Sequence, residues 1–191
     1  MSMTLYGSPA SPYVRRIRMY LDTDDYTFKV VDVYDDNTRA EYAKISPIRK
    51  LPVLEHNGTT VFDSRIIYQY LRQQRGMAAP AIAEHNLVSA VDAVTDSLII
   101  LLMTKRSGLE PDPARLIIKL QLERIPDTLQ WLNTQALQGA FDDWHYPAIA
   151  LISLIDWAVF RELYSFEAYP ALLAAVEKHS QLAIVQATTP R

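Results

Sequence analysis

A short segment between an expected strand and an expected helix carries the first chemically informative residues. It runs from Gly7 to Arg16 and reads Gly-Ser-Pro-Ala-Ser-Pro-Tyr-Val-Arg-Arg, with Ser11 as helix cap and Pro12 as first helical residue. Backbone N–H groups at a helix start attract an anion, and a serine hydroxyl there can donate a hydrogen bond to it. The alternative is that Ser11 only caps its helix. The segment alone favours that interpretation, because Ser-Pro helix starts are common.

A second segment, Lys50–Leu54, reads Lys-Leu-Pro-Val-Leu. A proline near the beginning of a strand indicates an edge position or a turn into the strand. It can also follow a cis peptide bond, which leaves neighbouring backbone groups free to pair with a ligand. Taken alone, the segment favours the edge-strand interpretation.

The third segment places Asp63 and Ser64 at the start of another expected helix. Capping of that helix accounts for both residues. In the functional interpretation, the carboxylate of Asp63 captures an ammonium group. Ser64 and the helix N–H groups then capture a carboxylate of the same ligand.

Hydrophobic patterns predict the elements that position these segments. Strands are expected at 3–7, 26–33, 51–55 and 59–62. One helix is expected to begin at Ser11-Pro12, and two more are expected at 38–44 and 63–74. The order is β-α-β-α-β-β-α, in which the first strand–helix–strand unit can form a parallel pair. Asn57-Gly58 is the strongest turn signal and predicts a hairpin.

Beyond a linker at 76–80 the strand signal disappears. Helical patterns cover 84–107, 113–138, 147–164 and 170–178, and the tail is polar. The pattern at 147–164 is apolar nearly all round, as expected for a buried central helix. We therefore expect two domains, at 1–76 and 82–191, an α/β fold followed by an all-α fold.

Composition narrows the classes of function. The chain has 191 residues, a formal net charge of −3 and no cysteine. The absence of cysteine excludes disulfides and catalytic thiolates. The negative net charge disfavours nucleic-acid binding. Residues 1–78 carry a net charge of +2 and the remainder −5. The four histidines lie far apart, so we expect no metal site. Neither a signal peptide nor a membrane span is expected, and the predicted location is cytoplasmic.

The order and spacing of all three segments, followed by a helical half, resemble the cytosolic glutathione S-transferase superfamily, and small bacterial serine-type members in particular. The resemblance implies a thioredoxin-like N-terminal domain, an α-helical C-terminal domain and a homodimer. It implies glutathione as co-substrate, a small hydrophobic electrophile as second substrate and no covalently bound cofactor.

The resemblance also implies site residues. Ser11 matches the position whose hydroxyl bonds the glutathione sulfur, and Pro52 matches the cis-proline. Leu51 matches the residue whose backbone pairs with the cysteinyl part. Asp63 and Ser64 match the pair that binds the γ-glutamyl end. Tyr13 and Lys50 lie beside these positions and complete the predicted glutathione-binding set.

Two departures from the family pattern stand out. The family often has Asn-Pro-x-Gly-Lys before the cis-proline, where this chain has Ser46–Lys50 with Arg49 at the glycine position. The buried central helix usually begins with a Ser/Thr-x-x-Asp capping box. Here His145 and Ala148 occupy those positions, so the aspartate is absent.

The resemblance leaves three functions open. One is an enzyme that conjugates the glutathione thiolate to an electrophile, or uses glutathione to reduce a peroxide. The second is a non-catalytic regulatory protein similar to stringent starvation protein A, a glutathione-transferase-like partner of RNA polymerase. The third is a glutathione-binding fold with no measurable turnover. The presence of Ser11, Pro52, Asp63 and Ser64 together favours the enzyme.

Overall fold

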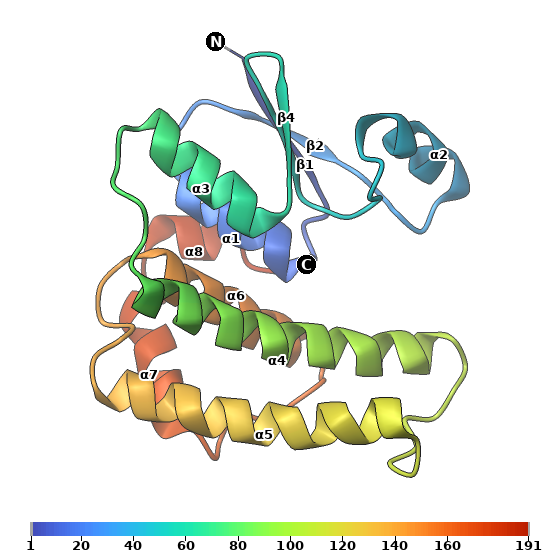
Figure 1. Ribbon diagram of the computed structural model, residues 1–191, viewed down its shortest axis with the longest axis vertical. Helices are drawn as coiled ribbons and strands as arrows, with labels where there is room; N and C mark the ends of the chain where they lie inside the picture. The colour runs from blue at the N-terminus through green and yellow to red at the C-terminus, as the bar shows by residue number, and fades with distance from the viewer. Residues whose placement is uncertain (1, 191) are drawn as a thin grey trace. The chain divides into compact units, whose positions relative to one another are not determined.

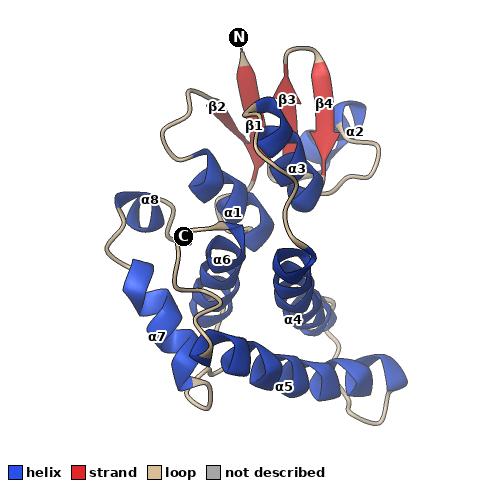
Figure 2. Cartoon of the chain, turned by 60° about the vertical axis from the view of Figure 1, so that its left-hand side comes forward, coloured by secondary structure: helices blue, strands red, loops and turns tan. Residues whose placement is uncertain are grey.

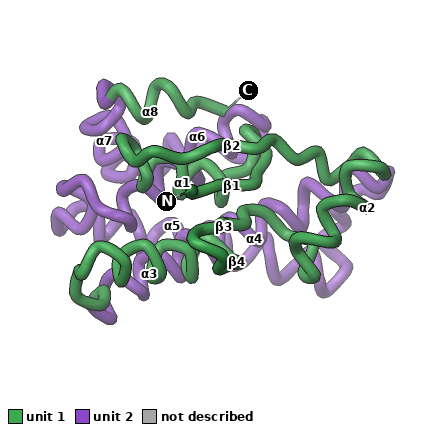
Figure 3. Tube along the Cα trace, turned by 90° about the horizontal axis from the view of Figure 1, so that it is seen from above, with its two compact units in different colours: residues 1–80, 183–191 green, residues 81–182 purple. Residues whose placement is uncertain are grey.

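The computed structural model describes residues 2–190, which form two compact units. The first unit comprises the chain up to Pro80 together with the C-terminal segment from Ala183 onward (Figure 3). The second unit is Ala81–Leu182. The tail after Leu182 therefore groups with the first unit, whereas the predicted domain boundaries place it in the second. The ranges 1–76 and 82–191 as separate folding domains stay a prediction.

The first unit is a four-stranded mixed sheet with helices, a thioredoxin-like arrangement (Figures 1 and 2). Its elements in chain order are β1 (Met3–Gly7), α1 (Pro12–Leu21), β2 (Thr27–Val30), α2 (Asp36–Ile45), β3 (Val53–His56), β4 (Thr59–Phe62) and α3 (Ser64–Gln74), and α8 (Ala183–Ala187) joins them. The strand order is β2-β1-β3-β4, with β1 parallel to β2 and antiparallel to β3. Every element predicted before the linker is present.

The β3–β4 hairpin forms as its turn signal predicts. His56 pairs with Thr59, so Asn57 and Gly58 are the two loop residues. Their φ angles are 51° and 77°, and a two-residue turn of this type requires positive φ at both positions. Asparagine and glycine tolerate such angles best, which is why this local signal is reliable.

The second unit is all helical, with α4 (Ile82–Arg106), α5 (Leu116–Leu137), α6 (Tyr146–Phe160) and α7 (Pro170–His179). Helix α6 is buried on almost every side and packs against α4 and α7, as its apolar sequence predicts. The core contains residues from all four helices, among them Val94, Leu129, Leu154 and Leu172. Within the described residues there are therefore eight helices, and the predicted fold class is confirmed.

Three details of the helical prediction need correction. The expected helix at 147–164 ends at Phe160. The tail after the expected helix at 170–178, predicted to be polar, contains a further short helix, α8, whose Val185 is buried. The buried helix α6 does not lack a cap, because Nδ1 of His145 accepts the N–H of Ala148 at 3.3 Å. An imidazole nitrogen thus replaces the expected hydroxyl or carboxylate oxygen.

Helix α4 is long and apolar enough, by length and composition alone, to cross a membrane. The sequence-based expectation is that the chain has no membrane span. In the structure, Val91, Val94 and Leu98 of α4 are buried in the helical core. A core helix passes the same test, so α4 by itself is weak support for a membrane span.

Candidate functional site

The strand register brings the three polar segments to one end of the sheet. Tyr6 near the end of β1 pairs with Val53 at the start of β3, and Val53 pairs with Phe62 at the end of β4. Adjacent strands lie about 4.8 Å apart. The loops that leave β1, enter β3 and leave β4 therefore begin side by side, although they are far apart in sequence (Figure 2).

Ser11 lies in the loop after β1 and is the N-cap of α1. Its Oγ accepts a hydrogen bond from the backbone N–H of Val14 at 3.4 Å, and its backbone N–H donates to the Ser8 carbonyl at 3.0 Å. The capping interpretation is therefore correct as far as it goes. A serine oxygen that accepts a bond still carries its own proton, and the half-buried Ser11 hydroxyl can donate it to an anion at the helix start.

Gly7 allows α1 to start close to the sheet. A Cβ at this position would lie 2.4 Å from Cγ1 and 2.7 Å from Cγ2 of Val14, and Val14 is fully buried. Any larger residue would push the first turn of α1, and Ser11 with it, away from the strand. Sequence reasoning missed this role of Gly7, because nothing local marks its contact with Val14.

The Leu51–Pro52 peptide bond is cis, as the family resemblance implies. Pro52 is buried, Leu51 is half-buried and Lys50 is exposed. The carbonyl of Lys50 accepts a hydrogen bond of 2.8 Å from the hydroxyl of Tyr42, whose pKa burial raises to about 12. This neutral, buried phenol anchors the backbone just before the cis bond. Sequence reasoning missed this contact, because the only local signal was a tyrosine in a weakly predicted helix.

Arg49 adopts a left-handed backbone with a φ of 50°. Glycine adopts this conformation without a steric penalty, which explains why a glycine at this position is common in the family pattern. The exposed arginine therefore keeps its place at some conformational cost.

Asp63 and Ser64 lie in the loop after β4, at the start of α3. Asp63 has a φ of 70°, and its Oδ1 accepts the N–H of Arg65 at 2.8 Å. Asp63 is exposed, whereas Ser64 is only 3% exposed. Capping uses one carboxylate oxygen of Asp63, so the other is available to an ammonium group.

Two tyrosines near the site also carry hydroxyl groups that could donate to a bound anion. Tyr6 donates its hydroxyl to Oε2 of Glu55 at 2.6 Å, and burial together with this carboxylate raises its pKa to about 12. Its proton is therefore committed to Glu55. The centroid of the Tyr13 ring lies 4.7 Å from the guanidinium carbon of Arg16, which is a cation–π contact.

No group of three or more His, Asp or Glu side chains that could hold a metal ion occurs within residues 2–190. The chemistry available at this end of the sheet is thus that of hydroxyl groups, backbone N–H groups, one carboxylate and the Lys50 and Arg49 cations. Such a set suits a small zwitterionic or anionic ligand.

Comparisons with known proteins identify the family. The model of the glutathione S-transferase N-terminal domain matches residues 5–86. The whole chain superposes on the whole of a glutathione S-transferase from Methylobacillus flagellatus KT, with a TM-score of 0.86 and 25% identity. Over 68 residues it is 37% identical to glutathione S-transferase U6 of Arabidopsis thaliana. The chain belongs to the cytosolic glutathione S-transferase superfamily.

The relatives differ in how much of their length matches this chain. The match to the Arabidopsis transferase covers 35% of this chain and 30% of that protein. The uncharacterized GST-like protein YibF of Escherichia coli K12 is 27% identical over 172 residues, which is 84% of each chain. The crystal structure from Methylobacillus flagellatus has glutathione bound.

Proposed function

We propose that the chain is a serine-type glutathione transferase, whose glutathione site is the end of the sheet where β1, β3 and β4 meet the three polar segments. Ser11 donates its hydroxyl proton to the glutathione sulfur. The backbone of Leu51, beside Pro52, pairs with the cysteinyl part of the ligand. Asp63 and Ser64 hold the γ-glutamyl end, and Tyr13 and Lys50 flank the ligand.

One observation carries this proposal. The register Tyr6–Val53–Phe62 aligns three segments whose chemistry fits the three parts of one tripeptide. A relative with the same fold binds glutathione in its crystal structure, which supports glutathione as the ligand here.

The reaction follows from thiol ionisation. A free thiol titrates near pH 8.5, so little thiolate exists at neutral pH. A hydroxyl donor and a helix N-terminus both stabilise the thiolate over the thiol and lower its pKa. The thiolate then attacks a small hydrophobic electrophile, forms a carbon–sulfur bond and expels the leaving group, such as chloride, with its bonding electrons. With a hydroperoxide the thiolate attacks one oxygen, the O–O bond breaks, the alcohol leaves after protonation, and a second glutathione converts the resulting sulfenic acid to glutathione disulfide and water. Ser11 acts as donor and not as nucleophile, and the chain has no cysteine to form a mixed disulfide of its own.

The same proposal includes a homodimer. Leu116, Ile117 and Leu120, on the first turns of α5, are 70%, 60% and 43% exposed. Contiguous exposed apolar residues of this kind indicate a protein–protein contact. Light scattering at micromolar concentration should give twice the chain mass, and a monomer would exclude the dimer.

Titration calorimetry with glutathione, followed by turnover with a chlorodinitrobenzene and with an organic hydroperoxide, tests the proposed enzyme. We expect saturable binding and turnover with at least one electrophile. If the protein binds RNA polymerase but not glutathione, the alternative regulatory function replaces the proposed one. Glutathione binding without turnover of any electrophile would reduce the proposal to a binding protein.

A further inference from the structure

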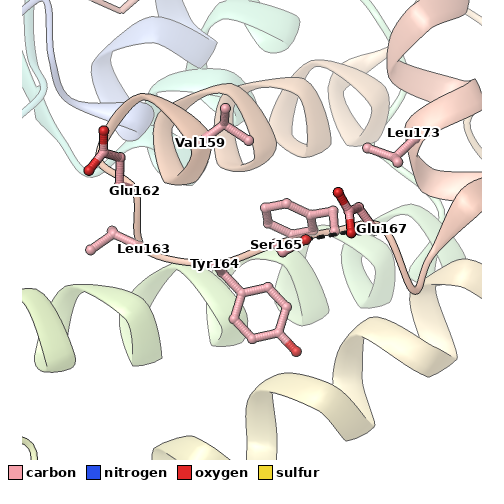
Figure 4. Close-up of a pocket in the computed structure, with 8 residues that line it drawn as sticks. Val159, Glu162, Leu163, Tyr164, Ser165, Glu167 and Leu173 are labelled. Atoms are coloured by element: carbon pink, nitrogen blue, oxygen red, sulfur yellow. Dashed lines mark hydrogen bonds between the residues drawn. The ribbon is translucent and has the colours of Figure 1, made fainter.

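A surface pocket lies wholly within the helical unit. It is formed by the end of α6, the 161–167 segment that follows it and the start of α7, and it has a volume of about 540 Å³ (Figure 4). This volume is in the range of small-molecule sites, about 300–1,000 Å³. No part of the glutathione site contributes to it. Its lining residues are Val159, Glu162, Leu163, Tyr164, Ser165, Phe166, Glu167 and Leu173.

The walls of this pocket, which we call the α6–α7 groove, are mainly apolar. Val159 is 57% exposed and Leu173 is 38% exposed, so both present hydrophobic surface that residues 2–190 leave open to solvent. Phe166 is buried and forms part of the packed core, which gives the groove a rigid base. Exposed aliphatic side chains over a fixed base provide binding energy for an apolar group.

The charged lining groups are all of one sign. Glu162 and Glu167 lie at opposite ends of the lining segment, and no Lys, Arg or His is among the lining residues (Figure 4). Burial raises the pKa of Tyr164 to about 12, so the tyrosine stays neutral. The nearest cations along the chain are engaged elsewhere, since Arg161 lies over the Phe160 ring and Lys178 pairs with Asp142.

Glu162 also occupies a backbone conformation that suits glycine. Its φ is 53°, and the N–H of Leu163 bonds the Ala158 carbonyl at 2.9 Å, which together form the helix-ending Schellman motif. This geometry offers a control, because replacing Glu162 by glycine removes a carboxylate while relieving the backbone.

We propose that the α6–α7 groove binds small amphipathic cations, namely primary or quaternary ammonium ions that carry an apolar group. The apolar part contacts Val159, Leu163 and Leu173, and the ammonium group pairs with Glu162 or Glu167. Residues 79–191 carry a net charge of −5, and this field attracts a cation to the groove.

Three probes of matched size test the charge requirement. Hexylammonium, hexanol and hexanoate share an apolar chain and differ in charge, and each is titrated into the full-length protein at low salt with amide NMR shifts as the signal. We expect hexylammonium to bind most tightly and to shift the amides of residues 159–167. Hexanol should bind more weakly and hexanoate least, and added salt should reduce only the binding of the ammonium ion.

Two variants locate the ammonium group. Glu162→Gly and Glu167→Gln should each weaken hexylammonium binding about two- to fivefold, the range for an exposed ion pair, and together more. Glu162→Gly should also raise the Tm by about 2–4 °C, so its weaker binding cannot come from unfolding. Glu123→Gln on α5, which is far from the lining segment in sequence and lines no part of the groove, is the matched control and should bind like the parent chain.

Several outcomes would overturn the proposal. They are equal binding of hexanol and hexylammonium, tighter binding of hexanoate, shifts confined to other segments, or unchanged affinity in the double variant. The result is independent of the glutathione site, because every lining residue lies within the helical unit and the titrations contain no glutathione.

Discussion

Helix α1 begins at Ser11 and helix α6 begins at His145, and both cap side chains accept the N–H three residues on. The distances are 3.4 Å to Val14 and 3.3 Å to Ala148, and both helices have a proline in their first two positions. Beyond the cap they differ. Helix α6 is buried nearly all round in the helical core, whereas α1 is amphipathic and starts at the end of the sheet where the candidate site lies.

The same kind of side-chain cap therefore has two different roles in the two helices. A serine oxygen accepts the helix N–H and still donates its own proton, so Ser11 can satisfy α1 and bind an anion at once. The imidazole nitrogen of His145 that accepts the N–H has no proton to give. We therefore propose that the cap of α1 also binds a ligand, whereas the cap of α6 serves helix stability alone.

The largest effect should come from the body of α6. Leu154 is fully buried, and Leu154→Ala should lower the free energy of unfolding by about 2–5 kcal/mol, through lost transfer energy and a cavity. Denaturant unfolding measures this, with Leu137→Ala, at a residue 74% exposed, as the matched control. Glutathione affinity of the folded variant should stay that of the parent; a large loss would mean that the core of α6 does more than support the fold.

Ser11→Ala should slow turnover near neutral pH about tenfold to a hundredfold. One hydrogen bond to a charged group is worth about 1.5–3 kcal/mol, and each 1.4 kcal/mol is about a factor of ten in rate. The pKa of bound glutathione should rise, so the lost rate should return at alkaline pH. Ser11→Thr, which keeps the hydroxyl, is the control. An unchanged pH–rate profile in a folded Ser11→Ala protein would leave Ser11 as a cap only.

Asp63→Asn should affect binding more than turnover at saturation. Asparagine has nearly the shape of aspartate and keeps an oxygen to cap α3, so the main change is the loss of the negative charge. We expect KM for glutathione to rise about tenfold, in line with one charged hydrogen bond, and kcat to change little. The reverse pattern, with kcat reduced and KM unchanged, would move Asp63 from ligand binding to the reacting sulfur.

The smallest effect concerns the cap of α6. His145→Ala should lower the free energy of unfolding by about 1 kcal/mol, and His145→Ser should restore it, because serine is a preferred cap. Neither change should alter the pH–rate profile, in contrast to Ser11→Ala. Equal stability of the Ala and Ser variants would show that the His145 contact contributes nothing to α6.

The elements that depend on neighbouring residues could be predicted from the sequence. Caps at Ser11 and Asp63, the Asn57-Gly58 turn and the apolar pattern of α6 each involve residues within one or two turns of chain, so their signals are local. The family resemblance predicted the cis Leu51–Pro52 bond, which the structure confirms. The roles of the site residues remain predictions, since they concern a ligand.

Other features arise from residues that are distant in sequence. The Oδ1 of Asn133 in α5 accepts hydrogen bonds from the N–H groups of Ala171 and Leu172 at the start of α7, at 3.0 and 3.3 Å. No sequence signal near α7 predicts this contact. The buried Arg15 of α1 donates to the carbonyl of Val185 at 3.2 Å, which ties the C-terminal segment to the first unit.

The sequence by itself determined the order of the elements, the helix starts at Ser11 and Asp63 and the chemical character of the three polar segments, because propensity, capping and turn geometry act over a few residues. Only the tertiary structure decided that these segments meet. The register of β1, β3 and β4 sets Tyr6 beside Val53 and Val53 beside Phe62, and it also brings the Tyr6 hydroxyl within hydrogen-bond distance of Glu55. Strand pairing depends on packing between segments some 50 residues apart, and a single sequence encodes such contacts only collectively.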